Sequence, residues 1–287
     1  MGNYYIYRLG QWLVSILPKR TAYAFAVFIS DIHFLFSKTD REAVRANLGA
    51  VAGKNVSQEM VREVFRNFGR FLVDFFTMTQ KVTPRYIQEH VECVNIEHID
   101  HALKKGKGAL LVSAHVGNWE MAGAVVSSLG YPLAVIALLH KDPRVNAFFD
   151  RQRVFFGTTV IPTTTTAVRR CLEHLKANRV LAIMGERDFG TKGIVMDFLG
   201  CKAMIPKGTA LFSLKTGAPM IPTVLVRKDN GDFCFTFHAP IEPPAVAKEG
   251  ITDALVAETM GRYLRVLEGE IREHPLQWLM FREFWHS

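Results

Sequence analysis

A chain of 287 residues is long enough for one large α/β domain or two small ones, and no linker, repeat or low-complexity segment divides it. The net charge of +8 and pI near 9.4 favour acidic partners, such as anionic lipid headgroups or an acidic carrier protein. We expect no nucleic acid partner, because the sequence has no zinc-finger spacing and no basic run interleaved with aromatics. Four scattered cysteines without a Cys-x-x-Cys pair argue against a disulfide framework or a zinc site.

The amino end combines apolar and basic residues. Hydrophobic residues make up 49% of the chain, including 21 phenylalanines, so we expect some apolar surface to face lipid or an acyl chain. Apolar stretches over residues 4–17 and 21–36 flank Lys19 and Arg20. The second stretch is short for a membrane span, so residues 1–37 are predicted to form membrane-associating helices that lie at the interface. The alternative is two ordinary helices packed on the main domain.

The rest of the chain alternates helical and strand patterns. Apolar residues at spacings of three and four predict helix over residues 39–80. Predicted strands alternate from there with predicted helices: strands 91–96, 108–114, 133–139, 160–162 and 180–184, and helices 99–105, 121–129, 142–156 and 167–178. Strands 219–226 and 233–238 flank Asn230-Gly231, a strong hairpin signal, and a helix over 252–273 follows. The pattern predicts an α/β domain over residues 38–287, with a mixed, largely parallel central sheet flanked by helices.

The end of one predicted strand carries a candidate general base. An apolar segment runs into Ser-Ala-His115 and a Gly-Asn turn, and Glu120 follows five positions after the histidine. One continuous helix would separate these two side chains by roughly 140°. If Gly117 makes the turn and Asn118 caps the next helix, the carboxylate can instead reach back to the ring and fix its tautomer. The other ring nitrogen is then free to take a proton. The alternative is a histidine that only hydrogen-bonds a helix start.

A second charged strand end follows residues 180–184. Arg187 is a candidate for gripping a phosphate, because a planar guanidinium binds two oxygens at once. Glu186 and Asp188 are candidates for orienting that arginine or a bound sugar, and the alternative is a solvated ion pair. Arg153 is a weaker candidate on a predicted helix.

The order of these residues resembles that of the bacterial lipid A late acyltransferase family, within the lysophospholipid acyltransferase superfamily. This family also includes mycobacterial phosphatidylinositol mannoside acyltransferases. Its motif is a histidine, four residues and an acidic residue, matched here by His115 to Glu120. The resemblance covers nearly the whole chain and rests on further features in chain order: the basic-flanked apolar amino end, Asn47-Leu48 after Arg41 and Arg45, Asn146 and Arg153 with Gly157, Gly185 to Asp188, and Pro275 with Gln277-Trp278. Lipid A enzymes usually have an Asp-Gln-Asp-like segment where this chain has Glu-Arg-Asp, which is more similar to the mannoside branch.

The resemblance implies an acyltransferase-like fold and transfer of a fatty acyl group from an acyl thioester to a hydroxyl of a membrane glycolipid. The donor would be acyl carrier protein or acyl-coenzyme A, and no other cofactor and no metal is expected. The first expectation for the acceptor is a lipid A precursor, and the alternatives are a phosphatidylinositol mannoside or a lysophospholipid. His115 and Glu120 would be the catalytic dyad of a direct transfer. Substrate-binding roles would fall to Asn118, Arg153, Glu186, Arg187 and Asp188. The implied location is the cytoplasmic face of the bacterial inner membrane, peripheral or anchored by the amino end.

Competing interpretations remain at this point. Ser113 would share a strand face with His115 and could act as a nucleophile, although no Gly-x-Ser-x-Gly elbow is present. Four phenylalanines could line an acyl groove or simply belong to the core: Phe148, Phe149, Phe155 and Phe156. At the level of the whole protein, the alternatives are a non-catalytic membrane lipid-binding protein and a soluble thioester hydrolase.

Overall fold

The computed structural model describes residues 2–53, 55–187, 193–246 and 250–285. Its core is a seven-stranded sheet in the order β1-β9-β8-β2-β5-β3-β4, in which only the pairing of β8 with β9 is antiparallel. The strands of this sheet are β1 (Val91–Val94), β2 (Ala109–Ser113), β3 (Leu133–Ala137), β4 (Thr159–Pro162), β5 (Val180–Met184), β8 (Met220–Arg227) and β9 (Phe233–Phe237). The predicted α/β class with a mixed, largely parallel sheet is confirmed.

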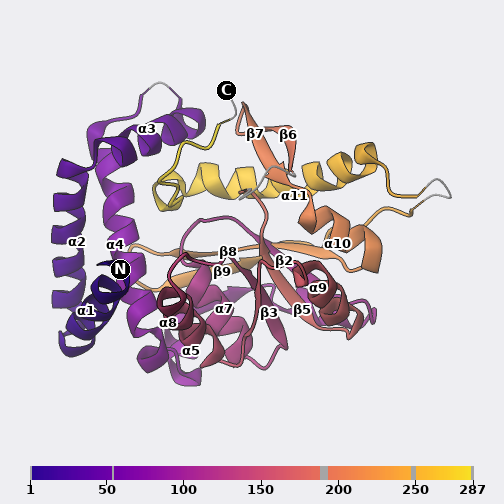
Figure 1. Cartoon of the computed structure of the whole chain (residues 1–287), viewed down its shortest axis with the longest axis horizontal. Helices are drawn as coiled ribbons and strands as arrows, with labels where there is room; N and C mark the ends of the chain where they lie inside the picture. Colours follow the sequence, from indigo (N-terminus) through magenta and orange to yellow (C-terminus); the bar gives the residue numbers. More distant parts are fainter. Residues whose placement is uncertain (1, 54, 188–192, 247–249, 286–287) are drawn as a thin grey trace.

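Helices cover both faces of the sheet. In Figure 1, α11 crosses one face, α7 and α8 cover the opposite face, and α1, α2 and α4 stand together at one end. The helices are α1 (Gly2–Ile16), α2 (Lys19–Phe36), α3 (Lys38–Ala52), α4 (Gln58–Lys81), α5 (Pro84–His90), α6 (Glu97–Leu103), α7 (Trp119–Ser128), α8 (Pro143–Val154), α9 (Ala167–Lys176), α10 (Gly208–Thr216), α11 (Asp253–Glu273) and the 3-10 turn η1 (Pro275–Gln277). In the part of the chain that the structure describes, no helix is both long and apolar enough to cross a membrane.

The central strand β2 explains why the sheet is buried on both sides. Leu110 and Val112 belong to the core beneath α11, whereas Ala109 and Leu111 belong to the core beneath α7 and α8. A strand covered on both faces is continuously apolar rather than alternating, which is the pattern of residues 109–112. The apolar run of β2 stops at the carboxyl end of the strand, where Ser113 and then His115 follow.

Several elements differ from the sequence-based expectation. The helix predicted over 39–80 is two helices, α3 and α4, because Gly53 has a positive φ of 74° and Ser57 caps α4 by accepting a hydrogen bond from the Met60 N–H. Helix α5 and the separate hairpin of β6 (Gly193–Phe198) and β7 (Cys201–Pro206) were not predicted. The β8–β9 hairpin at Asn230-Gly231 is confirmed.

The amino-terminal helices pack on the main domain through α4. Gly69 of α4 lies so close to α2 that a Cβ there would be 2.3 Å from the Ser30 hydroxyl and 2.9 Å from the Ala26 carbonyl oxygen. Arg62 and Arg66 of α4 both hydrogen-bond Asp31 of α2, at N–O distances of 2.8 Å. These contacts fix α2 against α4. The division of the chain into two parts at residue 37 stays a prediction.

Candidate active site

The turn between β2 and α7 places the candidate base in a loop. Gly117 has φ of 64°, and a Cβ there would be 2.0 Å from the Leu225 carbonyl oxygen, so no larger residue fits. Asn118 is the N-cap of α7, and its side-chain oxygen accepts a hydrogen bond from the Met121 N–H at 3.0 Å. The predicted turn, cap and helix start are confirmed, with His115 in the loop and Glu120 in the first helical turn.

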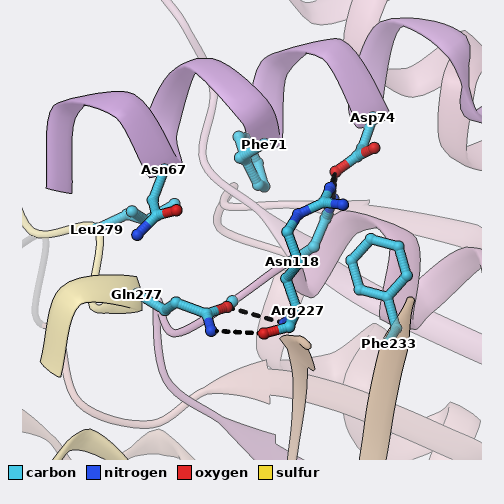
Figure 2. Close-up of a pocket in the computed structure, with 9 residues that line it drawn as sticks. Asn67, Phe71, Asp74, Asn118, Arg227, Phe233, Gln277 and Leu279 are labelled. Carbon is cyan, nitrogen blue, oxygen red and sulfur yellow. Dashed lines mark hydrogen bonds and ion pairs between the residues drawn. The ribbon is translucent and has the colours of Figure 1, made fainter. Parts of the chain in front are cut away.

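Neighbouring backbone holds this loop from two sides. The Leu279 N–H donates to the His115 carbonyl at 2.8 Å, the Gly117 N–H donates to the Gln277 carbonyl at 2.9 Å, and the Asn118 N–H donates to the Leu225 carbonyl at 2.8 Å. Figure 2 shows the Gln277 amide bridging the backbone N–H and C=O of Arg227, both at 2.9 Å. The end of β8 and the segment after η1 thus fix the backbone that carries the imidazole.

The carboxylate that pairs with the imidazole is Glu186, which follows β5. Its Oε1 lies 2.6 Å from His115 Nδ1 and accepts the His115 backbone N–H at 2.6 Å. The Glu186 side chain is fully buried, and the histidine side chain is 14% exposed. The expectation that Glu120 reaches back to the ring is therefore wrong: the two strand ends meet because β2 and β5 are adjacent in the sheet.

Close packing brings Glu186 to this position. The Gly185 N–H donates to the Ser113 carbonyl at 2.8 Å, which continues the β2–β5 pairing past the strand ends. A Cβ on Gly185 would lie 2.7 Å from Val112 and 2.9 Å from the Tyr263 ring, so this position requires glycine. The Tyr263 hydroxyl donates to the Gly185 carbonyl at 3.2 Å. The strand end is thus locked between β2 and α11.

The geometry assigns the two ring nitrogens different tasks. Because a carboxylate accepts hydrogen bonds, Nδ1 carries the proton that is donated to Glu186, and Nε2 is the lone-pair nitrogen. The edge of the Trp119 ring system packs against the imidazole with centroids 4.9 Å apart. The second Glu186 oxygen, Oε2, is buried without a hydrogen-bond partner among the described residues. A buried carboxylate in this position can stabilise positive charge that develops on the ring during a reaction.

Glu120 has a different partner. Its two oxygens accept hydrogen bonds from Arg153 of α8, at 3.0 Å from Nε and 2.6 Å from the terminal nitrogen. Burial by itself would lower the pKa of Arg153, but the Glu120 carboxylate outweighs it and raises the pKa above its usual value. This bidentate pair joins α7 to α8 beside the imidazole.

A cavity of about 410 Å³ opens from His115 and runs beneath α7. Besides the histidine, its charged lining residues are Glu120, Arg153, Arg187 and Arg282, and Ser113, His140, Thr158 and Thr223 also contribute. Elsewhere the lining is mostly apolar: Met78, Leu111, Ala122, Gly123, Ala124, Val126, Leu133, Val135, Ile136, Ala137, Leu138, Phe149, Ala182, Ile183, Met184 and Phe235. Its size and lining are those of a small-molecule site.

Only one of the four phenylalanines suggested for an apolar groove lines this cavity. Phe149 does so, whereas Phe148 is buried in the core and Phe155 is 64% exposed. Phe156 packs against the core. The groove is built instead from small and aliphatic residues of β2, β3, β5 and α7, which read in the sequence as ordinary core.

The remaining predicted site residues fall in different places. Arg187 lines the cavity, and burial lowers its pKa first, with Arg282 lowering it further. Asp188 lies outside the described residues. Asn118 is buried, and its side chain caps α7, so capping is the role that its geometry supports. Asn146 bonds the backbone N–H and C=O of His140 and shapes a loop near the cavity mouth.

Arg282 is a cavity residue that sequence reasoning missed. It reaches the cavity from the segment after β-bridge residue Trp278, far along the chain from the histidine motif. Asn47 holds this segment by donating to the carbonyls of Met280 and Arg282 at 3.0 and 2.8 Å. In the sequence, Asn47 appeared only as one feature of the family resemblance, and it did not indicate that Arg282 would reach the cavity.

The fold and site together define a class: an α/β enzyme that presents a buried carboxylate–histidine pair at the mouth of an apolar pocket. The profile of the bacterial lipid A biosynthesis acyltransferases matches residues 1–287. The chain therefore belongs to this family, and it is an acyltransferase.

Two curated relatives match nearly the whole chain, and a third matches about half of it. The chain is 27% identical to the phosphatidylinositol mannoside acyltransferase of Mycolicibacterium smegmatis, over 97% of this chain and 90% of that protein. It is 28% identical to the Mycobacterium tuberculosis protein of the same name, over 97% of this chain and 87% of that protein. A lipid A biosynthesis acyltransferase of Haemophilus influenzae is 24% identical over 48% of this chain and 44% of its own length.

Proposed function

We propose that this acyltransferase moves a fatty acyl group from an acyl thioester directly to a hydroxyl of a membrane glycolipid, with His115 as general base and Glu186 as the carboxylate that orients it. The observation that carries the proposal is the 2.6 Å contact between His115 Nδ1 and buried Glu186 at the mouth of an apolar cavity. This arrangement leaves Nε2 facing ligands that enter the cavity.

The proposed step is a direct attack of the acceptor hydroxyl on the thioester. Nε2 takes the proton of the acceptor hydroxyl while its oxygen attacks the thioester carbonyl carbon. The tetrahedral intermediate collapses, the carbon–sulfur bond breaks, and the imidazolium returns the proton to the thiolate. The products are an ester and a free thiol. Glu186 stabilises the imidazolium during the step, as the third member of a catalytic triad does.

The cavity fits the acyl chain of the donor, because its walls away from His115 are aliphatic. The mouth is cationic, with Arg153, Arg187 and Arg282 among its lining residues. Coenzyme A and the phosphopantetheine arm of acyl carrier protein both carry phosphate, which guanidinium groups bind in a bidentate manner. Arg187 and Arg282, which both line the cavity, are the proposed phosphate contacts.

For the acceptor, we favour a mannosylated phosphoinositide over a lipid A precursor. The relatives named for phosphatidylinositol mannoside match 97% of the chain, whereas the one named for lipid A matches about half. A lipid A precursor, the first expectation from the sequence, is the second candidate. Both acceptors present sugar hydroxyls on a phosphate-bearing lipid, so the proposed chemistry is the same.

We also propose that the enzyme works at a membrane surface, through α1 and α2. One face of α1 is exposed and apolar along its length: Tyr5, Ile6, Leu9, Trp12 and Ile16. Tyr7 of α1 packs on Phe149, which lines the cavity, and the exposed Leu138 lies at the cavity itself. Exposed apolar residues of this extent mark an interaction surface.

The test is transfer of a labelled acyl group from acyl-coenzyme A or acyl carrier protein to purified glycolipids. We expect His115→Ala to lower turnover by about 10²- to 10⁴-fold, and His101→Ala, at an exposed position on α6, to leave it unchanged. Equal transfer by wild type and His115→Ala would overturn the assignment. Free fatty acid as the sole product would instead establish a hydrolase, and binding without turnover a lipid-binding protein.

A further inference from the structure

A second cavity, separate from the one at His115, lies beside the amino-terminal helices. Its volume is about 730 Å³, and its walls come from the start of α2, from α4, from the β8–β9 turn and from the segment that includes η1. It has no lining residue in common with the cavity under α7. Asn67, Arg227 and Gln277 line both this cleft and the small pocket drawn in Figure 2.

Basic and acidic side chains together line the cleft. Five basic side chains line it: Lys19, Arg20, Arg70, Arg227 and Lys228. Three carboxylates line it as well: Glu63, Asp229 and Glu273. Most of the other charges are already paired, because Arg70 binds Glu63, Arg227 binds Asp74, and Lys228 binds Glu92.

Lys19 and Arg20 are the cations without such a partner. Among the described residues, neither forms an ion pair, and both are exposed at the first turn of α2. Asp229 likewise forms no ion pair among the described residues, and Glu273 lies 4.0 Å from His274. Burial lowers the pKa of nearby Lys81, Asp74 opposes this, and Lys19 and Arg227 lower it further. An anion in the cleft would therefore relieve repulsion as well as gain contacts.

The floor of the cleft is rigid. The buried carboxylate of Asp74 accepts hydrogen bonds from Tyr23 of α2 and from Arg227 of β8, and Figure 2 shows the contact with Arg227. The Arg227 guanidinium also stacks over the Tyr23 and Phe233 rings, 5.1 and 4.6 Å from their centroids, and donates to the Gly231 carbonyl at 3.0 Å. The cleft is thus a preformed site and not a flat charged surface.

Its position indicates where the anion comes from. The exposed apolar stripe of α1 ends at Ile16, and Lys19 and Arg20 follow within one turn of chain. If the stripe enters the acyl region of a bilayer, the two cations lie at the depth of the lipid phosphates. A sugar or glycerol headgroup attached to such a phosphate would lie beside Asn67, Asn230 and Gln277, whose side chains are already hydrogen-bonded within the protein.

We propose that this cleft binds the phosphodiester headgroup of an anionic membrane phospholipid and thereby docks the enzyme, at a site distinct from the catalytic cavity. The proposal rests on the membrane-surface part of the proposed function, and it requires no catalysis. The lipid bound here is an anchor and is not acylated, since the cleft does not include His115.

The test is sedimentation with phosphatidylcholine vesicles with and without phosphatidylglycerol, in the absence of acyl donor. We expect Lys19→Gln with Arg20→Gln to weaken binding to the anionic vesicles by about thirtyfold, since each basic side chain near an anionic surface contributes roughly fivefold. Lys176→Gln with Arg179→Gln removes the same charge from an exposed region near the start of β5 and should leave binding unchanged. Equal binding by both double variants would overturn the proposal.

A second variant separates a cleft from a charged surface. His274→Trp adds bulk to the cleft and leaves its lysines and arginines in place, so it should also weaken anionic-vesicle binding, whereas attraction to a flat surface would be unaffected. Titration with inorganic phosphate and with a short-chain phosphatidylglycerol distinguishes free anion from lipid. Tighter binding of phosphate than of the lipid, or loss of acyl carrier protein binding alone in the Lys19/Arg20 variant, would overturn the lipid assignment. His115→Ala should bind vesicles like wild type. A failure of the transfer assay would therefore overturn the proposed function without affecting the vesicle result, and the reverse also holds.

Discussion

At the residue scale, two carboxylates near His115 have separate tasks. Glu186 is fully buried and touches the ring, whereas Glu120 is 9% exposed and binds Arg153 in a bidentate manner. A carboxylate that contacts the base stabilises the imidazolium formed in the transition state. A carboxylate that holds an arginine at the cavity mouth stabilises the packing of α7 on α8 and the shape of the entrance.

This division predicts different effects of two matched substitutions. Glu186→Gln should lower kcat by about 10²- to 10⁴-fold, because the glutamine cannot stabilise the imidazolium. Glu120→Gln should lower kcat far less, but raise the KM for the acyl donor and reduce the free energy of unfolding by about 1–3 kcal/mol, since Arg153 loses its counter-charge. Steady-state kinetics and urea unfolding of both variants measure this. A larger kcat loss in Glu120→Gln, with stability intact, would restore Glu120 as the partner of the base.

At the element scale, the contact between α2 and α4 depends on the absence of a side chain at Gly69. A methyl group there would meet the backbone carbonyl of Ala26 at 2.9 Å, and backbone cannot move away as a flexible side chain can. Helix propensity favours alanine over glycine by about 1 kcal/mol, but overpacking costs about 1–3 kcal/mol. The clash should therefore dominate.

We expect Gly69→Ala to lower the free energy of unfolding by about 1 kcal/mol, as the net of these two effects. Gly269→Ala is the matched control in α11, where a Cβ meets nothing within 4 Å. That variant should be more stable than wild type by about 0.5–1 kcal/mol. Urea unfolding of the two proteins compares them directly, and stabilisation by Gly69→Ala would show that α2 is free to move away from α4.

Much of the architecture was predictable from local patterns, and the pairing of His115 with Glu186 was not. The β2–α7 turn follows from Gly117 and Asn118, whose conformational and capping preferences act within a few residues. The partner of His115 depends instead on strand order, because β5 and not β3 lies beside β2. Strand order is a property of the whole sheet, so the spacing of His115 and Glu120 pointed to the wrong carboxylate. The β6–β7 hairpin, which pairs apart from the main sheet, was also not predicted.

At the scale of the whole molecule, the helix that carries the exposed apolar face, α1, packs directly on α8, whose Phe149 lines the cavity at His115. Tyr7 of α1 stacks with Phe148 and contacts Phe149 edge-on, and Arg144 of α8 lies over the rings of Tyr4 and Tyr5. Helix α1 is therefore fixed against the helix that borders the cavity mouth. A surface that binds a bilayer through α1 would bring the mouth to the membrane in a constant orientation.

We expect Leu9→Asp with Trp12→Asp to lower binding to neutral phosphatidylcholine vesicles by about tenfold or more, because each side chain loses 1.5–3 kcal/mol of burial. Both positions are more than half exposed, so the fold should be retained, as checked by circular dichroism. Val168→Asp, on an exposed position of α9, is the control and should leave binding unchanged. Unaltered sedimentation of the α1 variant would show that the bilayer contacts another face.

The adjacency of β2 and β5 also bears on how the protein acquires its activity. His115 and Glu186 are 71 positions apart in the chain, with β3, β4 and their helices between them. The two strands pair only after that intervening segment has closed into a loop, and long-range parallel pairing is a slow event in folding. A nascent or partly unfolded chain with the sheet incomplete thus has a histidine but no oriented base. The contact between His115 and Glu186 and the cavity beside it therefore form only once the sheet is complete.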